Sequence, residues 1–325
     1  MKYLYVLTSD SSDYYMEQAM LSIVSLRNKM PNALVTLLVD TSTEANLIGK
    51  RSGICSLVDE LVSVKIDDRF NKKARSRWLK TSMRQHIKGN FLYVDGDTII
   101  TEELSALSEM NIDLGAILDK HSYLSDIKKY SLGYRWLENV YKRLEFVSIN
   151  SDTHFNGGVL LCRDCDLGHK FFEEWHRLWL LCFEKGILTD QQSFNEANYN
   201  LGNIIIELAG KWNCQIIAYG GVKNLHDAKI IHYFSSASDK NPYIFSNQEI
   251  YKKIRDIGFI DREISDMLAF SKSLFTPDTR LQTKDSFTKS TIYFVAKYIY
   301  HSKIGIVLES IFCLFMRKKG NILFK

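Results

Sequence analysis

Two carboxylates, Asp95 and Asp97, stand one residue apart at the end of an apolar run that begins at Phe91. This run is typical of a buried strand, and in open α/β sheets ligands bind beyond the carboxyl ends of the strands. Two hard oxygen donors at this spacing suit Mg²⁺ or Mn²⁺ held together with a phosphate-bearing substrate. Gly96 lets the chain turn between them, and Asp-Gly-Asp is also ordinary turn chemistry. The segment alone therefore predicts either a metal site or a solvated turn.

Three further groups of polar residues stand beside apolar runs. The run Asn156-Gly-Gly158 enters a buried strand, and its glycines favour either a bulge or room for a substrate's ring. Asp190 has the position of a helix N-cap, which would be its structural role. His232 ends a short strand; a lone histidine there is more often structural, but an Asp-x-Asp site needs a third donor. We therefore predict His232 as a metal ligand.

Residues 71–90 carry seven basic side chains and no acidic one. The helical spacing of Trp78, Leu79, Met83 and Ile87 predicts a helix with these side chains facing inward. Such a helix could simply be a solvated basic face. Because it leads into Asp95 and Asp97, we favour the interpretation that it supplies countercharge to a bound polyanion.

The overall composition limits the possible classes of protein. The chain has 325 residues and a formal charge of +4, but residues 289–325 alone carry +6, so residues 1–288 sum to −2. The body is therefore not a nucleic-acid binder by charge. The apolar run after Lys2 is too short for a signal peptide, which predicts a cytoplasmic protein. Six scattered cysteines fit reduced thiols, and Cys162 of the formal CxxC pair fits the end of a buried strand.

Strand-like and helix-like runs alternate over the first part of the chain. This alternation predicts a doubly wound parallel sheet, and residues 121–147 and 171–183 are expected to be mainly helical. The expected strands are residues 2–8, 34–40, 61–66, 91–94 and 229–234, and the expected helices of the first part are 14–30, 43–50 and 71–90.

The order of these motifs resembles the GT-A-fold sugar-nucleotide glycosyltransferases, specifically glycosyltransferase family 8, which includes glycogenin and bacterial lipopolysaccharide galactosyltransferases. The similarity covers about residues 1–245 and rests on the basic helix, Asp95-Gly-Asp97, the Asn156 run, Asp190 and His232. It implies an α/β, Rossmann-like GT-A fold, in which a single nucleotide-binding mixed sheet is flanked by helices. Residues 246–325 would then form a helical C-terminal appendage.

The resemblance also implies roles for individual residues. Asp95, Asp97 and His232 would bind Mn²⁺ or Mg²⁺, and Asp95 would also reach the ribose. Asp190 and Gln191 would be catalytic groups flanking the anomeric region of the donor sugar. The remaining substrate-binding residues would be Thr8, Ser9, Arg77, Lys80, Asn156, Gly157 and Gly158.

The chain departs from the family pattern at two places. The family often continues its histidine as HxxGxxK, whereas here Ser235 stands at the glycine position and Lys240 comes two residues late. The loop after the first strand carries extra residues, so neither Asp10 nor Asp13 is assigned to the nucleotide base.

The predicted reaction moves a sugar from a nucleotide-diphosphate donor, by family habit a UDP-sugar, to a glycan or lipid-linked acceptor in surface polysaccharide or lipopolysaccharide synthesis. The metal ion, helped by Arg77 and Lys80, would stabilise charge on the departing phosphate. The resemblance alone implies that the configuration at the anomeric carbon is retained.

Residues 291–316 are rich in aromatic and aliphatic side chains, but Lys297, His301, Lys303 and Glu309 interrupt them. No run of about 18 uncharged apolar residues is therefore available to span a bilayer. Aromatic side chains beside lysines suit the interface of an anionic membrane, which predicts a peripheral protein on the inner face of the cytoplasmic membrane. The alternative is a helical pair packed on the body.

Two other functions remain open. The run Val94-Asp-Gly-Asp-Thr98 also fits the haloacid dehalogenase phosphatases, with Asp95 as the phosphoryl-accepting nucleophile and Asp97 as acid/base. That motif usually opens its domain, whereas about ninety residues precede it here. A non-catalytic, membrane-peripheral carbohydrate-binding protein is the third possibility, and the intact set of polar residues argues against it.

Overall fold

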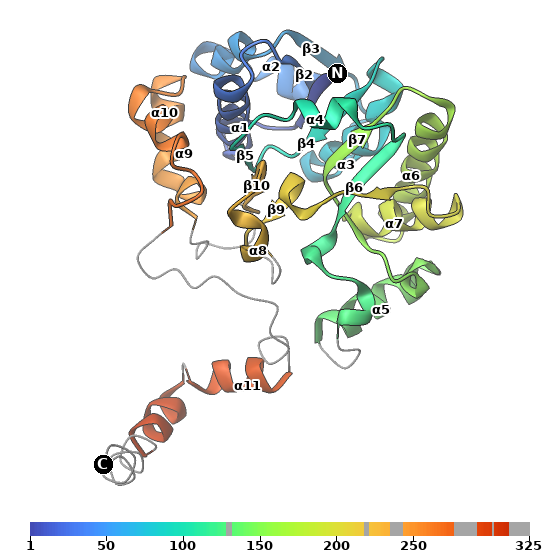
Figure 1. Ribbon diagram of the computed structural model, residues 1–325, viewed down its shortest axis with the longest axis vertical. Helices are drawn as coiled ribbons and strands as arrows, with labels where there is room; N and C mark the ends of the chain where they lie inside the picture. The colour runs from blue at the N-terminus through green and yellow to red at the C-terminus, as the bar shows by residue number, and fades with distance from the viewer. Residues whose placement is uncertain (128–131, 218–220, 235–242, 276–290, 301, 312–325) are drawn as a thin grey trace.

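The computed structural model describes residues 1–127, 132–217, 221–234, 243–275, 291–300 and 302–311 (Figure 1). Within these residues a seven-stranded sheet has the order β3-β2-β1-β4-β7-β6-β8, and a three-stranded sheet has the order β5-β10-β9. The strands are β1 Lys2–Leu7, β2 Leu34–Asp40, β3 Glu60–Val64, β4 Phe91–Val94, β5 Thr98–Ile100, β6 Leu114–Leu118, β7 Phe155–Cys162, β8 Ile206–Glu207, β9 Cys214–Gln215 and β10 Ile230–His232.

Helices connect most of these strands. The α-helices are α1 Tyr15–Lys29, α2 Thr41–Ala45, α3 Lys72–His86, α4 Ser105–Glu109, α5 Leu132–Leu144, α6 Asp166–Glu184, α7 Gln191–Asn200, α8 Val222–Leu225, α9 Gln248–Ile257, α10 Arg262–Leu268 and α11 Thr291–Tyr300. The 3₁₀ turns are η1 Gly49–Leu57, η2 Asp119–His121, η3 Leu124–Asp126, η4 Ser148–Asn150, η5 Gly210–Asn213 and η7 Ile244–Ser246.

The large sheet is mixed. Strand β1 pairs in parallel with β2 and β4, and β2 pairs in parallel with β3. Strand β7, however, runs antiparallel to both β4 and β6. The purely parallel sheet expected from strand–helix alternation is therefore wrong for β7, while the mixed sheet implied by the family resemblance is confirmed. The cause is the excursion over residues 119–154, which returns the chain to the sheet at the carboxyl edge of β6.

Helices cover both faces of this sheet (Figure 1). One buried core joins α1 and α9 to the sheet and includes Leu21 and Ile254. The other lies under α3, α6 and α7 and includes Leu79, Trp175 and Phe194. Successive residues of β1 alternate between the two cores, as the period of a strand requires. Packing on both faces therefore holds the sheet, including the edge where the parallel strands β1, β2 and β4 end.

The expected helix over residues 43–50 is divided in two. Helix α2 begins after Asp40, whose side chain accepts a hydrogen bond from Thr43 N at 2.9 Å. It ends at Ala45, and the turn η1 begins at Gly49, whose φ of +56° is left-handed. The helix has already ended before Gly49, because Ile48 is extended, with φ of −120° and ψ of 159°.

The C-terminal segments differ in their contacts. Helices α9 and α10 pack on the body, and Tyr251 and Leu268 belong to the same buried core as α1. In Figure 1, α11 lies away from the sheet, and its Tyr298 is 83% exposed. Across the helices that the structure describes, none is both long enough and apolar enough to cross a bilayer.

Candidate active site

The loop of Asp95 and Asp97 links the two sheets. Strand β4 ends at Val94, and β5 begins at Thr98. Strand β10 pairs antiparallel with β5 and places His232 opposite Thr98, while Tyr233 N donates a hydrogen bond to Asp97 O at 3.1 Å. The register of this small sheet therefore delivers a histidine from late in the chain to the two carboxylates.

Asp95, Asp97 and His232 converge on one point. His232 Nε2 lies 3.2 Å from Asp97 Oδ1 and 3.9 Å from Asp95 Oδ2. One donor atom from each of the three side chains lies within 4.8 Å of the others, and no second such His/Cys/Asp/Glu group occurs among the residues that the structure describes. Two carboxylate oxygens and one imidazole nitrogen form a donor set that Mn²⁺ or Mg²⁺ accepts. The residues present thus fit a divalent cation.

Lys80 lies beneath these carboxylates and is only 5% exposed. Its Nζ donates to Asp95 at 3.1 and 3.3 Å and lies 3.5 Å from Asp190 Oδ2. Tyr93, which was not predicted from the sequence as a site residue, also donates a hydrogen bond from its hydroxyl to Asp95. Burial, followed by the Asp95 charge, raises the pKa of Tyr93 well above its usual value, so the hydroxyl keeps its proton. Tyr93 precedes Asp95 by two residues on the strand, which is the period that places both on one face.

Asp190 and Gln191 stand at the start of α7. Arg77 Nε lies 2.9 Å from Asp190 Oδ1. Burial opposes ionisation of Asp190, but the charges of Lys80 and Arg77 outweigh it and hold the pKa of this carboxyl below its usual value. The Asp190 side chain makes no capping hydrogen bond, so the structural role considered for it is not observed. Gln191 Nε2 donates to Phe155 O at the start of β7.

The glycine pair of β7 lies in a stretch where the pairing of β7 with β6 is irregular. Pairing of β7 with β6 shifts register between Ala116 and Ile117, opposite residues 156–160. Gly158 O accepts a hydrogen bond from Asp95 N at 2.8 Å. A Cβ atom at Gly158 would meet the metal-site side chains, whereas at Gly157 the nearest atom, Cε of Lys80, would be 3.8 Å away. The backbone of β7 thus lies against the candidate metal site.

Asn156 is already engaged within the protein. Its Oδ1 accepts from Gly158 N at 2.9 Å and from Asn213 Nδ2 at 3.0 Å, and its Nδ2 donates to Asp119 Oδ1 at 3.2 Å. Asn213 Oδ1 in turn lies 3.0 Å from His232 Nδ1. Neither Asp119 nor Asn213 was predicted from the sequence. Asp119 follows an apolar strand, a signal that could have revealed it, whereas no pattern marks Asn213.

Thr8 and Ser9 follow β1 at the same edge of the sheet, and both are buried. The Thr8 hydroxyl donates to Lys72 O at 3.4 Å, and the Ser9 hydroxyl donates to Asp13 Oδ1 at 2.7 Å. Lys72 Nζ forms ion pairs with Asp10 at 2.9 Å and Asp13 at 2.7 Å. The edge where the nucleotide is expected is therefore organised by a network of side chains from β1, its following loop and α3.

Carboxylates of the protein itself neutralise much of the positive charge of the basic helix α3. Five of its basic side chains form ion pairs with carboxylates from other elements. The pairs are Lys72 with Asp10 and Asp13, Arg75 with Asp40, Arg77 with Asp190, Lys80 with Asp95 and Asp190, and Arg84 with Asp164. Ser235 and Lys240, where the chain departs from the family's HxxGxxK pattern, lie outside the described residues.

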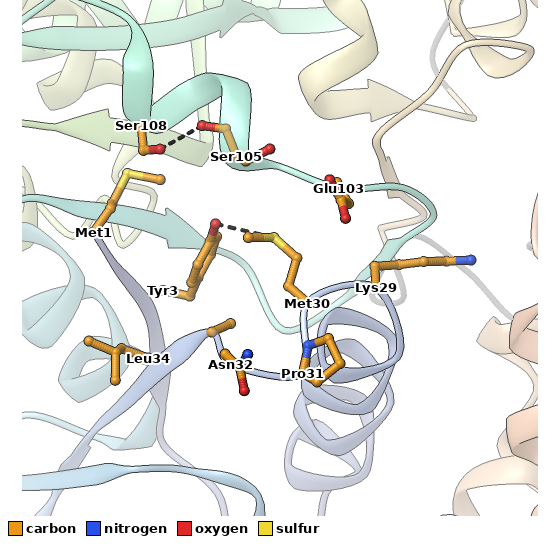
Figure 2. Close-up of a pocket in the computed structure, with 11 residues that line it drawn as sticks. Met1, Tyr3, Lys29, Met30, Pro31, Asn32, Leu34, Glu103, Ser105 and Ser108 are labelled. Atoms are coloured by element: carbon orange, nitrogen blue, oxygen red, sulfur yellow. Dashed lines mark hydrogen bonds between the residues drawn. The ribbon is translucent and has the colours of Figure 1, made fainter.

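A cavity of about 450 Å³ lies at the opposite edge of the sheet. Figure 2 shows Met1, Tyr3 and Leu34 around it, near the amino ends of β1 and β2, together with Met30 and Ser108. None of the predicted site residues lines this cavity. The candidate active site is instead the polar cluster beyond the carboxyl ends of β1 and β4.

No protein-family model and no curated protein matches the chain. Among solved structures it is similar to the bifunctional glycosyltransferase WbbM, with a TM-score of 0.55 and 16% identity over 82% of this chain and 51% of that one. The chain thus spans about half the length of WbbM.

Weaker structural matches include two further glycosyltransferases. The galactosyltransferase LgtC, in complex with donor and acceptor sugar analogs, matches with a TM-score of 0.48 and 14% identity over 86% of this chain and 98% of that one. GlyE of Streptococcus pneumoniae matches with a TM-score of 0.48 and 18% identity over 86% of this chain and 66% of that one. The similarity to WbbM confirms the predicted architecture, and the chain has the GT-A fold of glycosyltransferases.

Proposed function

We propose that this protein is a metal-dependent glycosyltransferase that moves a sugar from a nucleotide-diphosphate donor, a UDP-sugar by family resemblance, to a glycan or lipid-linked acceptor. The convergence of Asp95, Asp97 and His232 beyond β4 of a GT-A sheet is the observation that carries this proposal. Two carboxylates and a histidine at that edge suit a cation shared with a diphosphate.

Cleavage of the bond between sugar and diphosphate leaves negative charge on the departing phosphate oxygens. Mn²⁺ or Mg²⁺, held by Asp95, Asp97 and His232, would supply electrostatic stabilisation of that charge. Lys80 and Arg77 add positive charge at the same edge, although each is also paired with a carboxylate. The basic side chains thus serve two purposes in the proposal, organising the site and countering the charge of the donor.

Asp190 and Gln191 are assigned to the donor sugar. Ion pairs with Arg77 and Lys80 keep Asp190 ionised, and an ionised carboxylate near the anomeric carbon would stabilise positive charge as it develops on the sugar. Gln191 is held by Phe155 O beside Asn156 and would orient the donor and the acceptor. From the family resemblance we also propose that the configuration at the anomeric carbon is retained. Thr8 and Ser9 would contact the nucleotide, and Gly157 and Gly158 would lie beside the donor sugar.

We further propose peripheral contact with the inner face of the cytoplasmic membrane, where a lipid-linked or lipopolysaccharide precursor would be the acceptor. Apolar side chains of α11 and residues 303–311 are exposed, including Ile292, Tyr298 and Ile304, and Lys297 and Lys303 lie among them. Aromatic and basic side chains together favour an anionic interface. Co-sedimentation with anionic vesicles should be lost when residues 289–325 are removed, and retention of binding would contradict the proposal.

The proposed reaction is tested by offering the purified protein a panel of nucleotide sugars. Release of nucleoside diphosphate is measured by mass spectrometry with MnCl₂ or MgCl₂ and again with excess EDTA. Release from one donor that depends on added metal supports the proposal and identifies the sugar. Turnover that is equal in EDTA would contradict the metal-dependent mechanism.

A further inference from the structure

Two neighbouring groups fix the orientation of the Asn156 carboxamide, because one can only donate a hydrogen bond and the other can only accept one. Gly158 N–H can only donate, and it lies 2.9 Å from Asn156 Oδ1. The Asp119 carboxylate accepts, and its Oδ1 lies 3.2 Å from Asn156 Nδ2. The amide oxygen of Asn156 must therefore point toward Gly158 and its NH₂ group toward Asp119.

This orientation determines the orientation of Asn213. The same Asn156 Oδ1 lies 3.0 Å from the Asn213 side chain, and an amide oxygen can only accept. Asn213 must therefore present its NH₂ group to Asn156. Its own oxygen then faces the other way, where His232 Nδ1 lies 3.0 Å from it.

The direction of each hydrogen bond is thus set in turn, from Asn156 to Asn213 and from Asn213 to the His232 ring. Because Asn213 Oδ1 can only accept, His232 Nδ1 must carry a proton. In a neutral ring the lone pair is then on Nε2, which lies 3.2 Å from Asp97 Oδ1. Both of these atoms are acceptors, and a cation bound to both would satisfy them. Asn213 has no exposed surface and His232 is 2% exposed, so water does not compete for either bond.

Two contacts also restrain rotation of the ring. The ring of Phe234 stacks on the ring of His232, with centroids 4.0 Å apart. The backbone of Phe234 is left-handed, with φ of +49°. A half turn about the Cβ–Cγ bond would exchange Nε2 with Cε1 and leave Asn213 Oδ1 facing a carbon. The stacking limits tilting of the ring plane, and the Asn213 oxygen opposes this half turn.

We propose that Asn213, oriented by Asn156, is a positioning residue that holds His232 as the Nδ1–H tautomer, so that Nε2 is the metal-binding atom. This inference rests on the metal site of the proposed function. It also gives Asn156 a role beyond the donor sugar, because the oxygen and the NH₂ of its carboxamide both form hydrogen bonds that help to set the histidine. A ligand held in the required tautomer binds a cation without prior rearrangement.

The test compares Asn213→Leu, which removes both hydrogen bonds, with Asn213→Asp, which retains an acceptor for Nδ1–H but loses the donor to Asn156. The matched control is Asn198→Leu: Asn198 is buried in α7 and bonds to Ile205 N at 2.9 Å and to Asn203 at 3.4 Å, outside the site. Affinity for Mn²⁺ alone is measured by calorimetry for each folded variant. The proton-bearing nitrogen of His232 is identified in nitrogen-15 spectra of histidine-labelled, metal-free protein at about pH 8, above the ordinary histidine pKa.

We expect Asn213→Leu to lose about 10- to 100-fold in Mn²⁺ affinity. Asn198→Leu should stay close to the wild type, Asn213→Asp should lose less affinity than Asn213→Leu, and wild-type His232 should carry its proton on Nδ1. Equal Mn²⁺ affinity in Asn213→Leu and wild type would overturn the inference, as would an unprotonated Nδ1 in the wild type. If the wild type binds no Mn²⁺, the proposed metal site fails, and the imidazole spectra alone then decide whether Asn213 sets the tautomer.

Discussion

A Cβ atom on Gly158 would lie 2.4 Å from Cε1 of His232, closer than real Cβ atoms approach another heavy atom. It would also lie 2.8 Å from Asp95 Oδ2. The backbone of β7 therefore touches two of the three candidate metal ligands directly. At the adjacent Gly157 nothing would lie closer than 3.8 Å. Two neighbouring glycines thus differ sharply in how much space the site leaves them.

This difference gives a matched pair of variants. Gly158→Ala should displace the His232 ring and lower Mn²⁺ affinity about tenfold or more, the scale of losses when ligand orientation is disturbed. Gly157→Ala should leave Mn²⁺ affinity near that of the wild type. Calorimetric titration with MnCl₂ measures both, and thermal unfolding shows that both fold. Equal affinities in the two variants would show that β7 does not shape the metal site.

Lys80 should be needed for stability as well as for binding. Lys80→Met removes the ammonium group that contacts both Asp95 and Asp190, which leaves Asp95 without its lysine and Asp190 with Arg77 alone. The free energy of unfolding should fall by about 3 kcal/mol, the lower end for breaking a buried ion pair, since Asp95 is partly exposed. Lys73→Met, on the exposed face of the same helix, should change it by less than about 0.5 kcal/mol. Urea denaturation of both proteins decides this.

Helix α9 should stabilise the loop that follows β1. Arg255 Nε donates to the fully buried carboxylate of Glu17 at 2.7 Å, and its Nη1 donates to Ser11 O at 3.0 Å. Its guanidinium also lies 4.2 Å from the ring centroid of Tyr14. Arg255→Met would leave the Glu17 charge buried and unpaired, at a cost of about 3 kcal/mol.

A double mutant separates the charge from the packing. Adding Glu17→Gln to Arg255→Met removes the unpaired charge and should recover part of the lost stability in urea denaturation. Because the loop lies at the expected nucleotide edge, the donor KM of Arg255→Met should rise more than kcat falls. A double mutant no more stable than Arg255→Met would show that the ion pair is not the reason for the loss.

His121 should make stability depend on pH. Its Nε2 accepts a hydrogen bond from Gln215 N at 3.0 Å, which requires a neutral ring. Burial, helped by the charge of Lys223, lowers the pKa of His121 from 6.5 to about 4. Between these two values the unfolded chain binds a proton that the folded protein excludes. Stability should therefore fall as pH decreases from 6.5 toward 4, by about 1.4 kcal/mol per pH unit from this residue.

The variant that checks this is His121→Asn, because asparagine tolerates the left-handed φ of +50° found at this position. Urea denaturation at two pH values on either side of the ordinary histidine pKa gives the change in unfolding free energy for each protein. The variant should lose less stability on acidification than the wild type. An identical loss in both would assign the pH dependence to other groups.

Local patterns in the sequence were sufficient to predict much of the fold. Strand β2 covers the predicted residues 34–40, and β1 and α1 differ from the predicted 2–8 and 14–30 only by one residue at their ends. Continuous apolar runs and helical spacing reflect burial on each element, so they can be read locally. The direction of β7 could not, because strand orientation depends on which partners a strand meets after the long excursion over residues 119–154.

The site could be predicted only in part, for the same reason. Asp95 and Asp97 stand together in the sequence, whereas His232 was added by family resemblance and a need for a third donor. The structure supplies the pairing of β10 with β5 that brings His232 to them. Asn213 carries no local signal, since its role arises only from contacts with Asn156 and His232.

The proposed chemistry is tested most directly by nucleoside diphosphate release from the preferred nucleotide sugar, measured with Mn²⁺ for the wild type and Asp97→Asn. The proposed function predicts metal-dependent release that is abolished in Asp97→Asn while the variant retains the wild-type melting temperature. Release from no donor, together with hydrolysis of p-nitrophenyl phosphate that requires Asp95, would contradict it and support the phosphatase alternative.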